Sequence, residues 1–227
     1  MARTLNDLEQ SLGYDLGQDA VTVGGTDWNR YRDHFNRAIR VWANRYNPTV
    51  LKQSATLSVV QGTATYSLTS TFMRPLGSVW ITFTDGGEKE YPIIKAEDKH
   101  QKSTSERYCW TTGSKKDGFT LNLNPTPTSS NAGTDNGEYW YLKEPDVLVN
   151  SADSCEVPDE DALIAYGRMK EHERDDEDAK AALDRQEWEF RINDMEAMDK
   201  EGPEAARDYS YAKTQEEIEG YQGIGEA

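Results

Sequence analysis

Apolar residues recur at helical spacing near the beginning of this chain and again in its last third. A short helix is expected at 4–13, and a stronger one at 27–46 with Thr26 as its N-cap. One arc of the stronger helix is apolar or aromatic and comprises Trp28, Tyr31, Phe35, Ala38, Ile39, Trp42 and Tyr46. The opposite side carries Arg30, Arg37, Arg40 and Arg45. The pattern predicts an amphipathic helix with a buried aromatic face and a basic outer face.

Between Val50 and Leu148 the apolar period changes to two, which is typical of strands. Hairpins are expected from 56–59 with 65–68, from 78–84 with 88–94, and from 107–112 with 119–123, and a last strand at 138–142. The Thr/Ser/Asn/Gly-rich stretch 126–137 is expected to be a long exposed loop. Short strands at this spacing predict a small antiparallel sandwich or barrel.

Helical periodicity returns after Pro158, breaks at the acidic run 175–178, and continues in a second helix to Lys200. The second helix is apolar on two sides. One side carries Ala179, Leu183, Phe190 and Ala197, and the other carries Trp188, Ile192 and Met195. A helix with two apolar faces has to bury one against its own domain and the other against a partner. We expect one of the two to lie between subunits, with Trp188, Ile192 and Met195 as the candidate interface residues.

These patterns together predict an α+β fold. The expected architecture is a helical bundle of three to four helices with an inserted small antiparallel β-sandwich or barrel and an extended C-terminal tail. The expected segments are N-terminal helices at 1–49, a β domain at 50–150, an acidic helical hairpin at 151–202 and a partner-binding tail at 203–227.

The tail 203–227 has isolated apolar residues in a polar background that Gly residues interrupt, too few to form a core of its own. The candidate anchors for a partner are Tyr209, Tyr211, Ile218, Tyr221 and Ile224. Alternation of Tyr209 and Tyr211 favours addition to a sheet edge, whereas the spacing by three of the others favours a helical turn or a groove-bound segment. Because glycines disfavour a regular helix there, an extended grip is expected.

The net charge of −16 is unevenly distributed. Residues 1–150 carry 16 Lys/Arg and 17 Asp/Glu, whereas residues 151–227 carry 9 and 24. So acidic a C-terminal third repels phosphate and disfavours a nucleic-acid-binding surface. It is either a solvated face that keeps the protein soluble or a negative wall along which an anionic polymer slides without sticking. The candidate wall residues are Glu171, Asp175, Asp178 and Asp184.

Signatures of catalysis are scarce. The chain has no Gly-rich phosphate loop, no Gly-x-Ser-x-Gly elbow, no His-Glu-x-x-His and no Cys-x-x-Cys. Three histidines are scattered along it: His34, His100 and His172. The acidic run 175–178 fits no calcium loop. We therefore expect no enzyme, no metal and no cofactor.

Cys109 and Cys155 are expected to be free thiols, and no apolar run approaches the roughly 18 residues of a membrane span.

Three of the six tryptophans, Trp80, Trp110 and Trp140, lie on predicted strands. Aromatic residues on strands are most often the core of a small sheet, which is the favoured interpretation. The alternative is a platform on which sugar rings stack.

Four stretches together resemble the head-to-tail adaptor (connector) proteins of tailed bacteriophages. They are WNRYRDHFNRAIRVWANRY at 28–46, the Gly-turn segment with its Tyr-x-Leu strand at 56–80, LNLNPTP at 121–127 leading into EYWYLKEPDVL at 138–148, and the acidic helical segment 157–194. Their order and spacing carry the resemblance more than any single motif does.

This resemblance implies a structural virion protein that forms a ring, commonly of twelve copies, beneath the portal protein of a DNA-filled capsid. Such a ring extends the DNA channel and offers a docking face to a tail or nozzle protein, while DNA passes through without specific binding. It implies a location in the virion after assembly in the host cytoplasm, with no membrane partner. The rival interpretation is a β-rich virion or surface protein that binds a receptor or glycan through residues 50–148.

Overall fold

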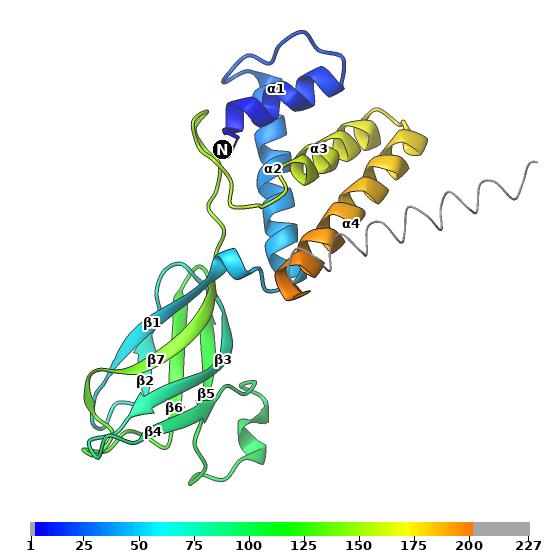
Figure 1. The fold of residues 1–227 in the computed structure, drawn as a ribbon. Coiled ribbons are helices and arrows are strands. Elements are labelled where there is room, and N and C mark those ends of the chain that lie inside the picture. The colour runs from blue at the N-terminus through cyan, green and yellow to red at the C-terminus, as the bar shows by residue number, and fades with distance from the viewer. Residues whose placement is uncertain (1–2, 202–227) are drawn as a thin grey trace, which may run out of the picture. The chain divides into compact units, whose positions relative to one another are not determined.

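The computed structural model describes residues 3–201, which form four α-helices and two small antiparallel sheets (Figure 1). They divide into two compact units. The β unit is Val50–Glu144, and the helical unit comprises the described residues up to Thr49 and from Pro145 onward. The α+β class expected from the sequence is therefore confirmed, with the β unit inserted into the chain of the helical unit.

The β unit ends at Glu144, whereas the strand pattern places its end at 150. The residues that follow pack into the helical unit, where Leu148 is buried. The Leu148 backbone exchanges two hydrogen bonds with the Asn36 side chain, at 2.8 and 2.9 Å. This extended segment therefore packs with the helical unit, because the Leu148 side chain is buried there and both of its backbone polar groups are hydrogen-bonded.

The long helix α2 (Thr26–Arg45) buries all seven residues of the predicted aromatic arc, which confirms the amphipathic pattern. Its N-cap is Gly25 rather than Thr26, which already has helical geometry. A tight turn precedes the helix, in which the Gly25 N–H donates to the Thr22 carbonyl at 2.9 Å. A Cβ atom at position 25 would lie 2.9 Å from that carbonyl oxygen, so glycine suits this position.

Helix α1 (Leu5–Asp15) begins with a capping box, in which Thr4 and Asp7 satisfy each other's backbone N–H groups. Its apolar face is fully buried through Leu5, Leu8 and Leu12. The predicted helix at 4–13 is therefore present and ends slightly later.

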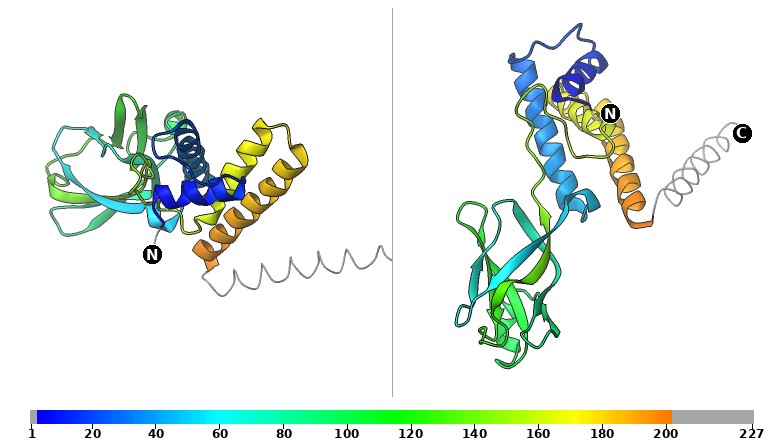
Figure 2. Two further views of the ribbon diagram at one scale, coloured as in Figure 1. Left: turned by 90° about the horizontal axis from the view of Figure 1, so that it is seen from above. Right: turned by 60° about the vertical axis from the view of Figure 1, so that its left-hand side comes forward.

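Helices α3 (Asp161–Arg174) and α4 (Asp178–Glu201) form a hairpin, as the two views of Figure 2 show. The acidic break predicted between them is confirmed, and Asp176 in the turn has a positive φ of 58°. The inner face of α3, which includes Leu163, Tyr166 and Met169, is buried. No helix in residues 3–201 is long and apolar enough to cross a membrane.

The β unit contains two antiparallel sheets. Its strands are β1 (Lys52–Val59), β2 (Thr65–Ser67), β3 (Phe72–Thr82), β4 (Glu88–Pro92), β5 (Tyr108–Ser114), β6 (Gly118–Asn124) and β7 (Gly133–Lys143). The 3-10 turn η2 (Asp98–Gln101) also belongs to it, and the turn η1 (Thr49–Leu51) begins at the last residue before it. The sheet orders are β1-β7-β3-β4 and β2-β6-β5. The predicted β3–β4 and β5–β6 hairpins are confirmed.

The first predicted hairpin is wrong, because β1 pairs with β7 and β2 pairs with β6. The chain crosses between the sheets at this point. The Tyr66 hydroxyl donates to the Thr63 carbonyl at 2.7 Å and accepts from the Val60 N–H at 3.1 Å, which holds the crossing segment. Local periodicity predicts both strands but carries no information on their distant partners.

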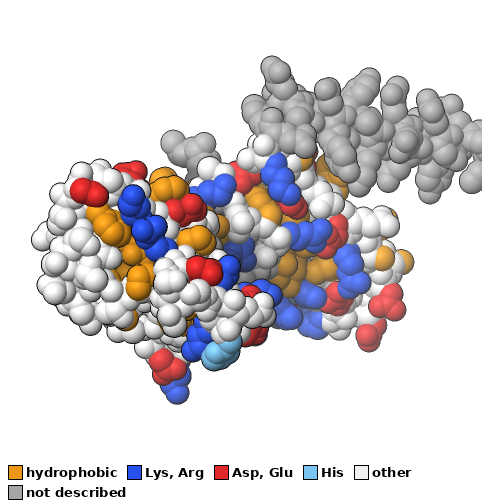
Figure 3. Space-filling view, turned by 90° about the horizontal axis from the view of Figure 1, so that it is seen from below, with side chains coloured by type: hydrophobic (Ala, Val, Ile, Leu, Met, Phe, Trp, Pro, Cys, Tyr) orange, Lys and Arg blue, Asp and Glu red, His pale blue; other side chains and the backbone are white. Residues whose placement is uncertain are grey.

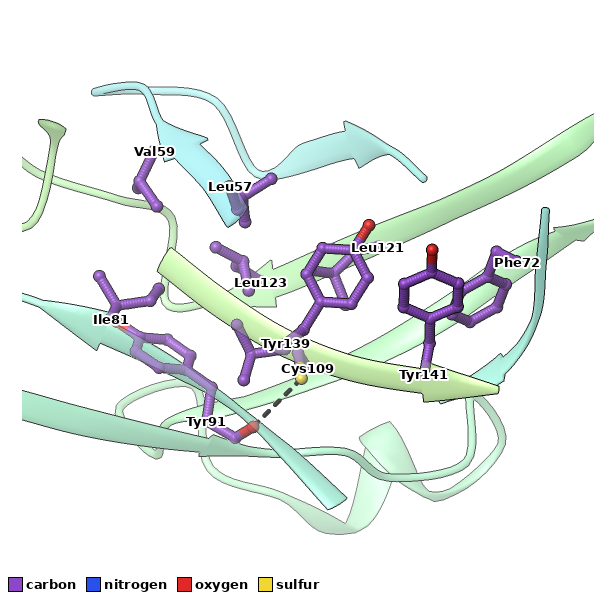
Figure 4. Close-up of a cluster of buried hydrophobic side chains, with 11 residues drawn as sticks. Leu57, Val59, Phe72, Ile81, Tyr91, Cys109, Leu121, Leu123, Tyr139 and Tyr141 are labelled. Carbon is purple, nitrogen blue, oxygen red and sulfur yellow. Dashed lines mark hydrogen bonds between the residues drawn. The ribbon is translucent and has the colours of Figure 1, made fainter. Parts of the chain in front are cut away.

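One apolar core fills the space between the two sheets (Figure 4). Both sheets contribute, for example through Val79 of β3 and Leu123 of β6. Cys109 lies within this core, and its thiol donates to the Tyr91 carbonyl at 3.2 Å. Burial raises the pKa of Cys109 to about 12, so this thiol is a packing residue.

The stretch 126–137 is not a long exposed loop throughout, because β7 begins within it at Gly133. Asn131 is buried, and its amide donates to the Tyr91 hydroxyl at 3.2 Å. A polar sequence here is held inside the unit by side-chain hydrogen bonds, a pattern that composition does not reveal.

Candidate interaction surfaces

One apolar face of α4 is core. Trp188, Ile192 and Met195 are buried inside the helical unit of a single chain. The Trp188 ring packs edge-on against Tyr166 of α3, with 5.0 Å between the ring centroids. This corrects the assignment of these three residues to a subunit interface, because their side chains are already buried within a single chain.

The other apolar face of α4 lies on the surface. Leu183, Phe190 and Met198 are 66%, 40% and 43% exposed. Ala179 and Ala182 extend the same strip toward the start of the helix and are also exposed. We call these five residues the α4 strip. Ala179, Leu183 and Phe190 belong to one of the two faces expected from the sequence, and Ala197, the fourth residue of that face, is half-buried.

Two of the four predicted wall residues are buried. Glu171 of α3 accepts from Arg30 at 2.7 Å, forms an ion pair with Arg174 at 2.6 Å, and lies 2.8 Å from a His34 ring nitrogen. Burial by itself raises the pKa of Glu171, but the hydrogen bonds from His34 and Arg30 outweigh it and lower the pKa. Glu171 therefore joins α2 to α3 and does not face a channel.

Asp184 of α4 has a similar role. It lies 2.7 Å from the Nδ1 atom of His172 and 3.1 Å from the guanidinium of Arg168. Asp175 and Asp178 are exposed. The prediction that Glu171 and Asp184 lie on an acidic wall is therefore wrong. Both are in the interior of the helical unit, where Arg and His side chains pair with them.

Ion pairs cover much of the hairpin surface. Arg191 binds Asp159 and Glu187, and Arg185 binds Glu173. On the face shown in Figure 3, Lys and Arg side chains alternate with Asp and Glu over the helical unit. The large acidic excess of the sequence is therefore partly neutralised locally.

A polar pocket of about 330 Å³ opens where the ends of α1 and α3 meet α2 and the start of α4. Its charged lining comprises the carboxylates Asp15, Glu171, Asp175 and Glu177 and the cations Arg174 and Lys180. Tyr31 also lines it; burial raises the pKa of its hydroxyl, and the neighbouring Arg30 side chain opposes that rise only in part. Sequence reasoning missed this pocket, because Tyr31 is one member of an apolar arc and the others are far apart in the chain.

The basic outer face of α2 divides into two parts. Arg30 turns toward Glu171 and Asp27, and Arg45 binds Glu189 at 2.6 Å. Arg37 and Arg40 are exposed and form no ion pair within the described residues. These two arginines, one turn apart on α2, are the part of the predicted basic face that remains available to a partner.

The three tryptophans do not form one platform. Trp80 and Trp140 are 44% and 47% exposed on β3 and β7 of the four-stranded sheet. Trp110 lies on β5 of the other sheet, beside Tyr108 and Lys99. The core interpretation is therefore wrong for Trp80 and Trp140, and the set proposed for sugar stacking is split between two sheets.

The predicted anchors of the tail, from Tyr209 to Ile224, lie outside the described residues. Within residues 3–201, no three His, Cys, Asp or Glu side chains gather as a metal site. His34 and His172 each lie beside a buried carboxylate, Glu171 and Asp184. What the described residues present is a set of contact surfaces, which is typical of a structural protein of a larger assembly.

Comparison with known families is consistent with that class. A family model described as SU10 adaptor protein matches residues 3–212. The chain belongs to the SU10 adaptor protein family, whose members are phage head-to-tail adaptors. No curated protein matches the chain. The resemblance drawn from the sequence is therefore confirmed, and the protein is an adaptor of the phage virion, in a family of structural proteins.

Proposed function

We propose that this adaptor forms a closed ring that joins the portal protein to a tail or nozzle protein and extends the DNA channel between them. The family supplies the adaptor role. The observation that carries the ring is the α4 strip, because Leu183 and Phe190 lie exposed on a helix whose opposite face is already in the core. An apolar strip on a highly charged helix is the pattern of a subunit contact.

The channel part of the proposal rests on charge. Asp178 is exposed, and Asp176 and Asp178 form no ion pair within the described residues. Like charge keeps a DNA duplex from adhering to a wall. With Glu171 and Asp184 in the interior, the exposed residues Asp175, Asp176 and Asp178 are the candidates for the wall.

The ring is tested by putting charge on the α4 strip. Leu183→Glu combined with Phe190→Glu places two carboxylates in the proposed contact, and we expect at least about tenfold weaker assembly with fold unchanged. Particle size is measured by light scattering and negative-stain imaging, for the protein alone and mixed with portal.

The matched control is Val23→Glu combined with Val60→Glu, since these valines are similarly exposed and lie off the strip. Rings that form normally from the strip variant would show that α4 contacts no other subunit. Wild-type protein that stays monomeric with and without portal would reject the ring itself.

A further inference from the structure

The outer face of the four-stranded sheet carries two half-exposed tryptophans. Trp80 of β3 and Trp140 of β7 lie on the two middle strands, with 44% and 47% of their surface exposed. Their chain neighbours Val79 and Tyr139 point to the opposite side and belong to the core between the sheets. The free side of an antiparallel sheet is ordinarily polar, so two large aromatic side chains on it indicate a contact surface.

The strand register places these indoles beside carboxylates. Trp80 lies directly opposite Glu138 on β7 and directly opposite Glu90 on β4. Trp140 follows Glu138 by two residues on the same strand and therefore shares its face. Side chains directly opposite each other in antiparallel strands have Cβ atoms about 4.5–5.5 Å apart, and diagonal neighbours are about 7–8 Å apart. The four residues therefore form one surface, which we call the Trp80 patch.

Both carboxylates of the Trp80 patch lack a counter-charge. Glu90 and Glu138 are exposed and form no ion pair within residues 3–201. The Ser78 hydroxyl donates to Glu90 at 2.6 Å, which restricts the orientation of this carboxylate. The patch therefore combines aromatic rings with negative charge that no described residue neutralises.

The other four tryptophans show which groups the indoles of this chain pack against. The Arg32 guanidinium lies 4.9 Å from the centroid of the Trp28 ring, and the Lys99 ammonium lies 5.7 Å from that of Trp110. The remaining two pack against tyrosine rings. Within residues 3–201, the two indoles of the Trp80 patch have neither a cation nor a ring against them. The flanking carboxylates favour a cation as the missing partner.

We propose that the Trp80 patch binds an arginine side chain of another protein. A guanidinium group is planar, so it stacks on an indole while the N–H donors at its edge reach the carboxylates of Glu90 and Glu138. Charge complementarity selects a basic partner protein over a second copy of this chain, which carries the same net charge of −16. The inference concerns the β unit and goes beyond the proposed ring, on which it does not depend.

Peptide binding to the full chain tests the proposal. The probe is the peptide Gly-Arg-Gly-Arg-Gly, and its neutral match has citrulline in place of each arginine. NMR follows the indole N–H signals of the six tryptophans, and the Trp80→Phe and Trp140→Phe variants assign the two that matter. We expect the arginine peptide to shift these two signals and to leave that of Trp110 unchanged. The citrulline peptide should bind about tenfold more weakly, because it loses the cation–π contact and both charge pairs.

A variant without the carboxylates separates their role from that of the rings. Glu90→Gln combined with Glu138→Gln should weaken binding of the arginine peptide at least about threefold, since it removes both charges and keeps both indoles. The matched control, Glu97→Gln combined with Glu106→Gln, removes two exposed carboxylates elsewhere in the β unit and should bind like wild type. Circular dichroism confirms that both variants fold.

The outcomes that overturn the proposal also identify the alternative. Unshifted Trp80 and Trp140 signals at millimolar peptide, or equal binding of the citrulline peptide, would show that the patch does not select arginine. Shifts with cellohexaose but not with the peptide would favour a glycan. Signals that move when the protein alone is concentrated would assign the patch to a second copy. None of these results bears on the portal ring, so the proposed function stands or falls separately.

Discussion

At the scale of single residues, two buried glutamates show that burial alone does not decide how a carboxyl group behaves. Glu171 has three cationic or histidine neighbours, and its pKa is lowered. Glu9 of α1 is equally buried, but it forms no ion pair within residues 3–201. Burial raises the pKa of Glu9 to about 8, and the Trp28 indole and the Arg32 charge oppose that rise only in part.

Glu9 makes stability depend on pH. The pKa of this carboxyl rises from 4.5 to about 8 on folding, so between these pH values the unfolded chain releases a proton that the folded chain keeps. The free energy of unfolding therefore falls as pH rises through this window. Glu9→Gln should flatten the fall and add about 1–3 kcal/mol at pH 8, measured by urea unfolding.

Glu97→Gln serves as the control, because Glu97 is exposed and should leave the pH profile as in wild type. A Glu9→Gln profile with the wild-type slope would show that Glu9 does not ionise in this range.

At the scale of elements, α4 carries two apolar faces with different roles. Trp188 is core against Tyr166, whereas Phe190 belongs to the α4 strip. The helical period reveals both faces, since it depends only on spacing. It contains nothing that says which face meets α3, because that depends on how the hairpin turn at Asp176 directs α4.

Truncating the two aromatic residues of α4 separates their roles. Trp188→Ala should lower the free energy of unfolding of the monomer by about 3–5 kcal/mol, because it leaves a cavity between α3 and α4. Phe190→Ala should change it by less than about 1 kcal/mol and instead weaken ring assembly. Denaturant unfolding below the assembly concentration measures the first effect, and light scattering measures the second. Equal losses of monomer stability would contradict the assignment.

At the scale of the whole molecule, the segment that we propose to bind the portal is the tail, residues 203–227. The sequence of residues 203–227 has too few apolar residues for a core of its own, which is why we propose a partner for this segment. Fixing each residue costs about 1–2 kcal/mol of backbone entropy, and many tails around one ring offset this cost through multivalency.

Truncation after Gly202 tests the tail. The shortened protein should keep the circular dichroism of the full chain but should fail to join heads that contain portal. The Leu183→Glu and Phe190→Glu protein, with its tail intact, is the counterpart, because it should keep the tail contact and lose the ring. Normal docking of the shortened protein would place the anchor elsewhere, with the basic face of α2 as the next candidate.

The sequence by itself determined much of this protein. The buried arc of α2, the break before α4 and two of the three hairpins all follow from local periodicity and turn signals, and four stretches of the sequence resemble the adaptor family. These features depend on neighbours within a few residues of each other, which is the range over which spacing and turn chemistry act.

The tertiary structure alone decided the partners. It paired β1 with β7, placed Glu171 beside Arg30, and brought Tyr31 to the edge of a pocket formed by four helices. It also assigned the Trp188 face to the core and left Leu183 and Phe190 at the surface. The physical reason is that a periodic pattern defines which face of an element is apolar or charged. What covers that face is set by contacts between segments far apart in the chain.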